Sequence, residues 1–150
     1  MKNKSYMIKN LLDLTDYATE TRKARRKGSK STQEFFTPYE IVKNMADKVP
    51  EEDWADPTKT FCEPCFGNGQ FVLYIIWNRI QHGVDYLTAI KTCYGVELMQ
   101  DNVKETYERI FKLLDLLEID YDKNEVLNVL KKNLVCSDFF EWYFENWCKK

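Results

Sequence analysis

The pattern that most constrains the fold is a short apolar run that ends in an acidic residue and is followed by a helical segment. It occurs three times, and the acidic residues at or just after the run ends are Glu63, Glu97 and Asp138. Strands separated by helices predict an α/β fold with a parallel sheet and right-handed crossovers. Ligands bind such sheets beyond the carboxyl ends of the strands, where these three carboxylates are expected to gather.

Hydrophobic periodicity and turn residues predict the individual elements. The expected strands are residues 59–62, 92–98 and 133–137. The expected helices are residues 6–26, 70–81, 84–91, 100–117, 125–132 and 139–147. One more helix is expected after Thr37 as N-cap and Pro38 as first residue, with Ile41, Val42 and Met45 on one face. We divide the chain into an N-terminal basic helical segment, residues 1–32, and a domain, residues 33–150.

The composition is that of an ordinary globular domain, with 44% hydrophobic and 31% charged residues. No apolar run approaches the roughly 20 residues needed to cross a bilayer, so no membrane partner is expected. The N-terminus has no apolar segment of the kind found in secretory signals, and we therefore expect a cytoplasmic protein.

The net charge of −2 conceals a dense basic run near the N-terminus. The run consists of Arg22, Lys23, Arg25, Arg26, Lys27 and Lys30. Such a cluster can neutralise phosphates, which predicts DNA as a partner. A solvated helix end explains the same residues equally well.

The five cysteines are expected to be free thiols, because no export signal accompanies them. Cys62 and Cys65 form a single C-x-x-C pair, and without a second pair we expect no metal site. Cys62, Cys93 and Cys136 lie in or beside predicted strands, where a small buried hydrophobic residue is the simplest interpretation.

A loop with two glycines, Gly67 and Gly69, connects the first predicted strand to a strongly apolar helix. Glycines there allow a tight turn and a close approach of the backbone to a ligand. Glu97 could accept hydrogen bonds from both hydroxyls of a ribose, or it could be an acid favoured by the dipole of the next helix. Asp138 could accept from an adenine amino group, or serve as N-cap of a helix starting at Phe139.

In order, these motifs resemble the amino-methyltransferases, especially the adenine-N6 DNA methyltransferases related to type I modification subunits. Residues 33–38 (QEFFTP) resemble the family's F-x-T-P element, which helps to hold the methionine end of the cofactor. Residues 63–71 (EPCFGNGQF) resemble its D-P-A-C-G-S-G-G-F loop, with Glu63 for Asp and Phe66 for Cys. Residues 95–98 (GVEL) are similar to the ribose-binding G-I-E element, and residues 136–140 (CSDFF) resemble the segment that contacts the adenine ring.

The resemblance implies a Rossmann-like class I methyltransferase fold, with a partial parallel sheet of strand order 3-2-1, that binds S-adenosylmethionine. It implies methyl transfer to the exocyclic amine of adenine. The implied cofactor-binding residues are Phe36, Thr37, Pro38, Glu63, Pro64, Cys65, Phe66, Gly67, Gly69, Phe71, Glu97, Leu98, Asp138 and Phe139.

One family element is missing. The catalytic Asn/Asp-Pro-Pro-Tyr/Phe motif, which ends a fourth strand, occurs nowhere in the sequence. We therefore expect only the cofactor-binding half, as a fragment of a longer enzyme, one chain of a split enzyme or a truncated relative without activity. A second chain or a homodimer would pair at the exposed edge of strand 59–62, unless the N-terminal helix covers that edge. The alternatives are a catalytically inactive binding module that regulates DNA modification or restriction, and an enzyme that methylates RNA or protein glutamine.

The remaining candidates have simpler interpretations. His82, the sole histidine, lies at a predicted helix end and is expected to be a cap-region residue. Trp142, Tyr143, Phe144 and Trp147 could stack on bases, but helical spacing favours packing.

Overall fold

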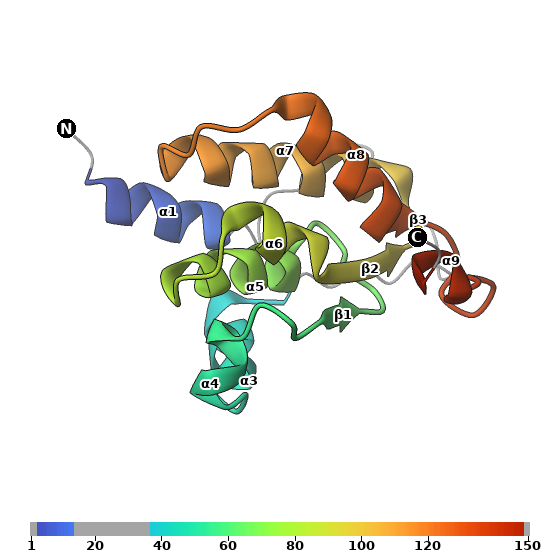
Figure 1. The fold of residues 1–150 in the computed structure, drawn as a ribbon, viewed down its shortest axis with the longest axis horizontal. Coiled ribbons are helices and arrows are strands. Elements are labelled where there is room, and N and C mark those ends of the chain that lie inside the picture. The colour runs from blue at the N-terminus through green and yellow to red at the C-terminus, as the bar shows by residue number, and fades with distance from the viewer. Residues whose placement is uncertain (1–2, 14–36, 149–150) are drawn as a thin grey trace, which may run out of the picture.

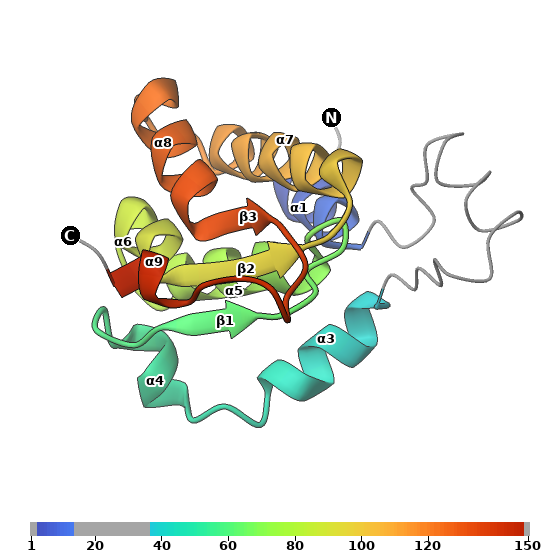
Figure 2. The same ribbon diagram turned by 90° about the vertical axis from the view of Figure 1, so that its right-hand side faces the viewer.

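The computed structural model describes residues 3–13 and 37–148, which form a mixed α/β structure around a parallel sheet. The strands are β1 (Phe61–Glu63), β2 (Cys93–Glu97) and β3 (Leu134–Cys136), with β2 in the centre. All three run in the same direction, so their carboxyl ends meet at one edge of the sheet (Figure 2). The parallel pairing and the strand order are as predicted.

Helices surround the sheet and account for most of the described residues (Figure 1). They are α1 (Lys4–Leu12), α3 (Tyr39–Ala46), α4 (Glu51–Ala55), α5 (Gln70–Gln81), α6 (Tyr86–Lys91), α7 (Gln100–Leu116), α8 (Lys123–Asn133) and α9 (Glu145–Cys148). Side chains of α1, α5, α7 and α8 form the main core with Cys93 and Leu134 from the strands. On the opposite face, Tyr94 contacts Trp147 of α9, with ring centroids 5.1 Å apart. The C-terminal segment therefore packs on the face that the long helices leave open, since successive strand residues point to opposite faces.

Helix α5 has the predicted bounds, and it ends at His82 as C-cap followed by Gly83 with φ of +89°. Helix α1 ends at Leu12, well short of the predicted Arg26; residues 14–36 lie outside the described part of the chain. The short helix α4 was not predicted.

Helix α3 differs from the prediction in two respects. It begins at Tyr39 with Pro38 as N-cap, one residue later than expected. The expected apolar face is confirmed for Val42, which is buried together with Ala46, but it is wrong for Ile41 and Met45, which are 49% and 53% exposed. The helix packs against α5 through the Val42 side, so its neighbours in space decided which apolar residues are covered.

The predicted helix over residues 139–147 is wrong, since only its end is helical. Asp138 Oδ1 accepts a hydrogen bond from the Phe140 amide at 2.9 Å, which makes a turn instead of an N-cap. Beyond the turn, Phe139 packs on Phe144, and Phe144 on Trp147, with centroids 5.2 and 5.6 Å apart. Contacts among these rings and with the sheet replace those of an amphipathic helix. Nowhere in residues 3–13 and 37–148 is a helix long and apolar enough to cross a membrane.

Candidate ligand site at the carboxyl edge of the sheet

Three acidic side chains lie together at the carboxyl edge of the sheet. Glu63 and Glu97 are the last residues of β1 and β2, and Asp138 follows two residues after β3. Burial raises the pKa of the Cys65 thiol, and the charges of Glu97, Glu63 and Asp138 raise it further. Glu63 lies beside Gly95 and Glu97 beside Cys136 in the strand register, so the tertiary structure brings the three carboxylates to one edge of the sheet.

The carboxylates differ in their surroundings. Glu63 is half-buried, and burial raises its pKa, although the Cys65 amide donates a hydrogen bond to it at 3.3 Å. Glu97 Oε1 accepts from the Met99 amide at 3.2 Å, in the loop that leads into α7. Clustered carboxylate oxygens are acceptors, suited to ligand hydroxyls, amino groups or a positive charge.

The glycine loop packs closely against its neighbours. Gly67 and Gly69 have φ of +54° and +96°, a conformation that side chains rarely adopt. A Cβ on Gly69 would lie 2.7 Å from Thr106 Cγ2 of α7. Phe66 is buried, its amide donates to the Val96 carbonyl at 3.2 Å, and its ring occupies the space beside Gly95.

Two side chains that sequence reasoning missed tie this loop to the rest of the fold. Arg109 is 2% exposed; it donates to the Asn68 carbonyl of the loop at 2.8 Å and to the Leu11 carbonyl of α1. Gln70 Nε2 donates to the Thr37 carbonyl at 3.0 Å, which brings Thr37 to the start of α5. On an amphipathic helix an arginine is expected in solvent, so the pattern carried no signal of this buried role.

The other predicted site residues are dispersed. Phe71 packs in a smaller core cluster with Val42, Trp54 and Tyr74, and Phe139 belongs to the C-terminal aromatic cluster. Leu98 is 59% exposed, and Pro64 and Pro38 are also exposed. Phe36 and the basic run, Arg22, Lys23, Arg25, Arg26, Lys27 and Lys30, lie outside the described residues.

All five cysteines are free thiols, and only Cys93 is buried. The prediction of buried thiols is wrong for Cys62 and Cys136, which are exposed. Cys62 points away from the main core, to the face on which its neighbour Tyr94 contacts Trp147, and Cys136 ends its strand at the carboxyl edge of the sheet. Across the described ranges, no group of three or more His, Cys, Asp or Glu side chains could hold a metal ion.

Comparison of the chain with protein families, with curated proteins and with solved structures gives no match. Function is therefore inferred from the residues at the carboxyl edge and from the motifs that lead to them.

Proposed function

We propose that this chain binds S-adenosylmethionine at the carboxyl edge of its sheet, as the cofactor-binding part of a Rossmann-like DNA adenine-N6 methyltransferase. The observation that carries the proposal is the placement of Glu63, Glu97 and Asp138 at or just beyond the carboxyl ends of three adjacent parallel strands, beside the glycine loop. In parallel sheets this edge is where nucleotide-like ligands bind. The strand order is compatible with such a fold.

The residues at this edge fit the cofactor by their chemistry. Glu97 offers carboxylate oxygens to a ribose diol, and Asp138 offers them to an adenine amino group. The left-handed glycines let the backbone approach the methionine end, near Thr37. Bound there, the cofactor would supply an electrophilic methyl group on a sulfonium. Glu63 would lie near the sulfonium, whose positive charge would offset the cost of ionising this half-buried carboxylate.

Calorimetric titration with S-adenosylmethionine tests the proposal independently of catalysis. We expect saturable binding that S-adenosylhomocysteine also shows, because the ribose and adenine contacts are shared. Absence of heat at high protein concentration, with the protein folded by circular dichroism, would contradict the assignment.

Methyl transfer by the 150-residue chain alone is not expected. The adenine amine is a poor nucleophile, so it must be held in line with the methyl group and drawn towards tetrahedral geometry. No Asn-Pro-Pro or Asp-Pro-Pro motif is present to do this. Labelled methyl appearing in adenine after incubation with the pure chain would refute this expectation.

The alternative is a binding module that regulates DNA modification or restriction without catalysing methyl transfer. A strand ending in Asn-Pro-Pro-Tyr/Phe, encoded in the same reading frame or in a neighbouring gene, would favour the enzyme.

If the basic run contacts DNA, retention on duplex DNA should fall steeply between low and moderate salt. Retention that salt does not change, or none at all, would leave the run as a solvated segment. RNA or protein glutamine as substrate stays a further possibility.

A further inference from the structure

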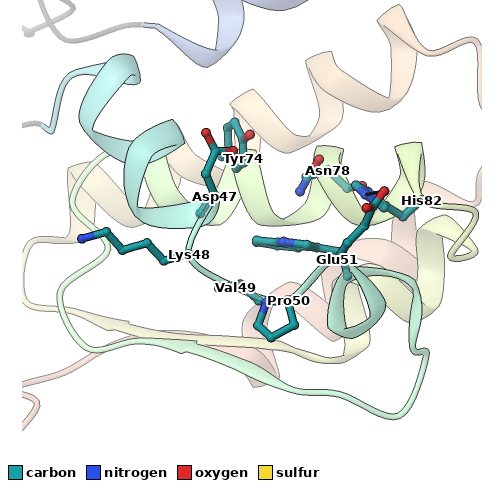
Figure 3. Close-up of a pocket in the computed structure, with 10 residues that line it drawn as sticks. Asp47, Lys48, Val49, Pro50, Glu51, Tyr74, Asn78 and His82 are labelled. Atoms are coloured by element: carbon teal, nitrogen blue, oxygen red, sulfur yellow. Dashed lines mark hydrogen bonds and ion pairs between the residues drawn. The ribbon is translucent and has the colours of Figure 1, made fainter.

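A pocket of about 490 Å³ lies between the end of α3, the start of α4 and one side of α5 (Figure 3). We call it the α3–α5 pocket. Its polar and aromatic lining includes Asp47, Glu51, Trp54, Tyr74, Asn78 and His82. None of the strand-end carboxylates or glycine-loop residues lines it, so it is separate from the candidate site at the sheet edge.

Two polar groups in this pocket have hydrogen-bonding capacity that the described residues do not use. Tyr74 is only 5% exposed, yet its hydroxyl makes no hydrogen bond to any residue in the described part of the chain. The side-chain amide of Asn78 likewise has no partner within these ranges, although its backbone carbonyl is used. The Tyr74 hydroxyl is not among the buried polar atoms that lack a partner, so it remains accessible in the pocket although the rest of the side chain is buried. A polar ligand or water can therefore bond to it there.

The charges in the pocket favour a cation. Figure 3 shows Asp47 beside Tyr74 at one end and Glu51 beside His82 at the other, whereas Lys48 is directed away. His82 Nδ1 lies 2.7 Å from the Asn78 carbonyl and therefore carries a hydrogen, while Nε2 faces Glu51 at 3.8 Å. Lys43 pairs with Asp47 at 2.7 Å, but both side chains are about half exposed, so screening keeps that pair weak.

Aromatic side chains form the wall between these two carboxylates. Trp54 stacks one face on Phe61, with centroids 4.9 Å apart, and meets Tyr74 edge-on at 6.5 Å. Aromatic faces attract ammonium groups electrostatically, and carboxylates add to that attraction. An anion would meet two carboxylates and is disfavoured.

We propose that the α3–α5 pocket binds a small organic ammonium ion, with its charge between Asp47 and Glu51 and its apolar body against Trp54 and Tyr74. The Tyr74 hydroxyl and the Asn78 amide oxygen accept hydrogen bonds from the ammonium group. This binding is independent of the function proposed for the sheet edge.

Three probes with one carbon skeleton test the proposal on the full chain: phenethylammonium, phenethyl alcohol and phenylacetate. Binding is followed by NMR shifts of the Trp54 indole and of amides in α3 to α5. We expect saturable binding of the ammonium in the millimolar range, and at least about tenfold weaker binding of the other two. Equal binding of the alcohol, or no saturable binding of the ammonium, would overturn the proposal.

Matched variants locate the charge. Glu51→Gln and Asp47→Asn should each weaken ammonium binding by about threefold or more, since each removes one exposed charge of the pocket. Glu52 is the exposed neighbour of Glu51 and does not line the pocket, so Glu52→Gln should leave ammonium binding unchanged. If Asp47→Asn fails to fold, Glu51→Gln decides, because the Glu51 side chain is 88% exposed. Unchanged binding in Glu51→Gln would overturn the proposal.

Discussion

Glu63, Glu97 and Asp138 are all half-buried, and each accepts a hydrogen bond from an amide two residues further along the chain. The amide bonds orient the carboxylates at the sheet edge, and a carboxylate has about four acceptor sites, so one such bond does not exhaust it. The two roles weighed for Glu97, ribose acceptor and acid before α7, are therefore compatible. Substitutions at these residues separate ligand binding from folding.

Glu97→Ala should weaken S-adenosylmethionine binding about thirtyfold or more, because losing two charge-assisted hydrogen bonds costs about 2–4 kcal/mol. Calorimetry measures the change, and circular dichroism checks the fold. Glu97→Gln is the control, since it keeps an acceptor for the Met99 amide and should bind with intermediate affinity. An unchanged dissociation constant in the alanine variant would remove Glu97 from the site.

Glu63→Gln should stabilise the protein at neutral pH while weakening cofactor binding. Burial raises the folded-state pKa of Glu63, so its ionisation costs stability as pH rises from the unfolded value through the folded one. Glutamine avoids that cost and keeps an acceptor for the Cys65 amide. Thermal unfolding should therefore show a higher midpoint than wild type at pH 7. The difference should vanish below about pH 4, where the acid is protonated in both states. A lower midpoint for Glu63→Gln at pH 7 would contradict this interpretation.

At the scale of elements, the close packing of the glycine loop on α7 is open to test. Gly69→Ala should destabilise the fold by about 2 kcal/mol or more, since positive φ and a clash with Thr106 add together. Gly83→Ala is the matched control: its φ is +89°, but nothing lies within 4 Å of the added Cβ. Denaturant unfolding measures the free energy of unfolding of both variants. Equal losses would show that the clash of the added Cβ with Thr106 of α7 does not destabilise the fold.

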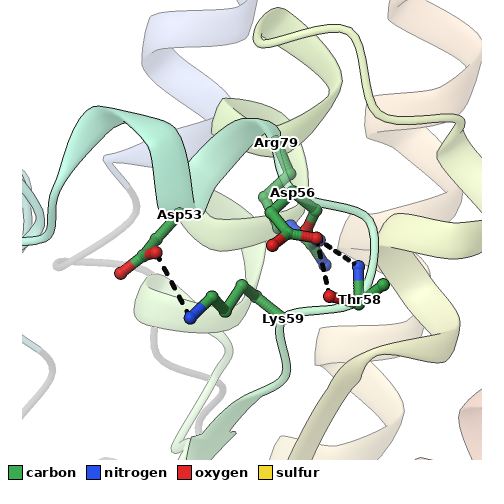
Figure 4. Close-up of polar contacts among 5 residues, drawn as sticks. All are labelled: Asp53, Asp56, Thr58, Lys59 and Arg79. Carbon is green, nitrogen blue, oxygen red and sulfur yellow. Dashed lines mark hydrogen bonds and ion pairs between the residues drawn. The ribbon is translucent and has the colours of Figure 1, made fainter.

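A second buried arginine, Arg79 of α5, holds the segment that leads into β1 (Figure 4). It donates to the Asp56 carbonyl at 2.6 Å and to Thr92 Oγ1, and its guanidinium lies 5.2 Å from the Phe61 ring centroid. Asp56 itself accepts from the Thr58 amide and hydroxyl at 2.9 and 2.7 Å, which closes the turn.

Arg79→Met should therefore lower the free energy of unfolding by about 1–3 kcal/mol, because the part-buried Asp56 carbonyl loses its donor. Arg79→Lys can restore one of the hydrogen bonds, so it should lower the free energy of unfolding by less. The denaturant midpoint measures both variants. A midpoint unchanged in Arg79→Met would mean that the arginine does not hold β1.

At the scale of the whole molecule, the feature to test is the sheet edge formed by β1. Among the described residues, β1 pairs only with β2, and α1 packs against α5 and α7 instead of covering β1. An unpaired parallel edge is a template for another strand. We therefore predict that the chain associates with itself or with a second polypeptide, which light scattering across the micromolar range would detect. A monodisperse monomer, with no partner encoded nearby, would defeat this prediction.

Lysine substitutions identify the associating surface. Cys62 is exposed in the middle of β1, so Cys62→Lys should weaken association by placing a charge on the edge strand. Cys148→Lys places the same charge on an exposed cysteine of α9 and serves as control. Equal effects of the two variants would show that association does not use β1.

Local pattern predicted much of this fold. The bounds of α5, the parallel sheet and the strand ends at Glu63 and Glu97 followed from apolar runs, acidic residues and the loop glycines. These features depend on neighbours in sequence, since periodicity and a loop glycine act within a few residues. The expectation that three carboxylates gather at one edge follows from the topology that the runs imply.

Only the tertiary structure decided which polar side chains are buried and where the aromatic residues lie. Arg79 and Arg109 are buried because each finds backbone carbonyls from segments distant in sequence. The C-terminal residues do not form the predicted amphipathic helix, because Trp147 packs instead against Tyr94 on the sheet face that the long helices leave open. Such contacts are non-local: their free energy depends on surfaces that exist only after the chain has folded, so no local pattern in the sequence encodes them.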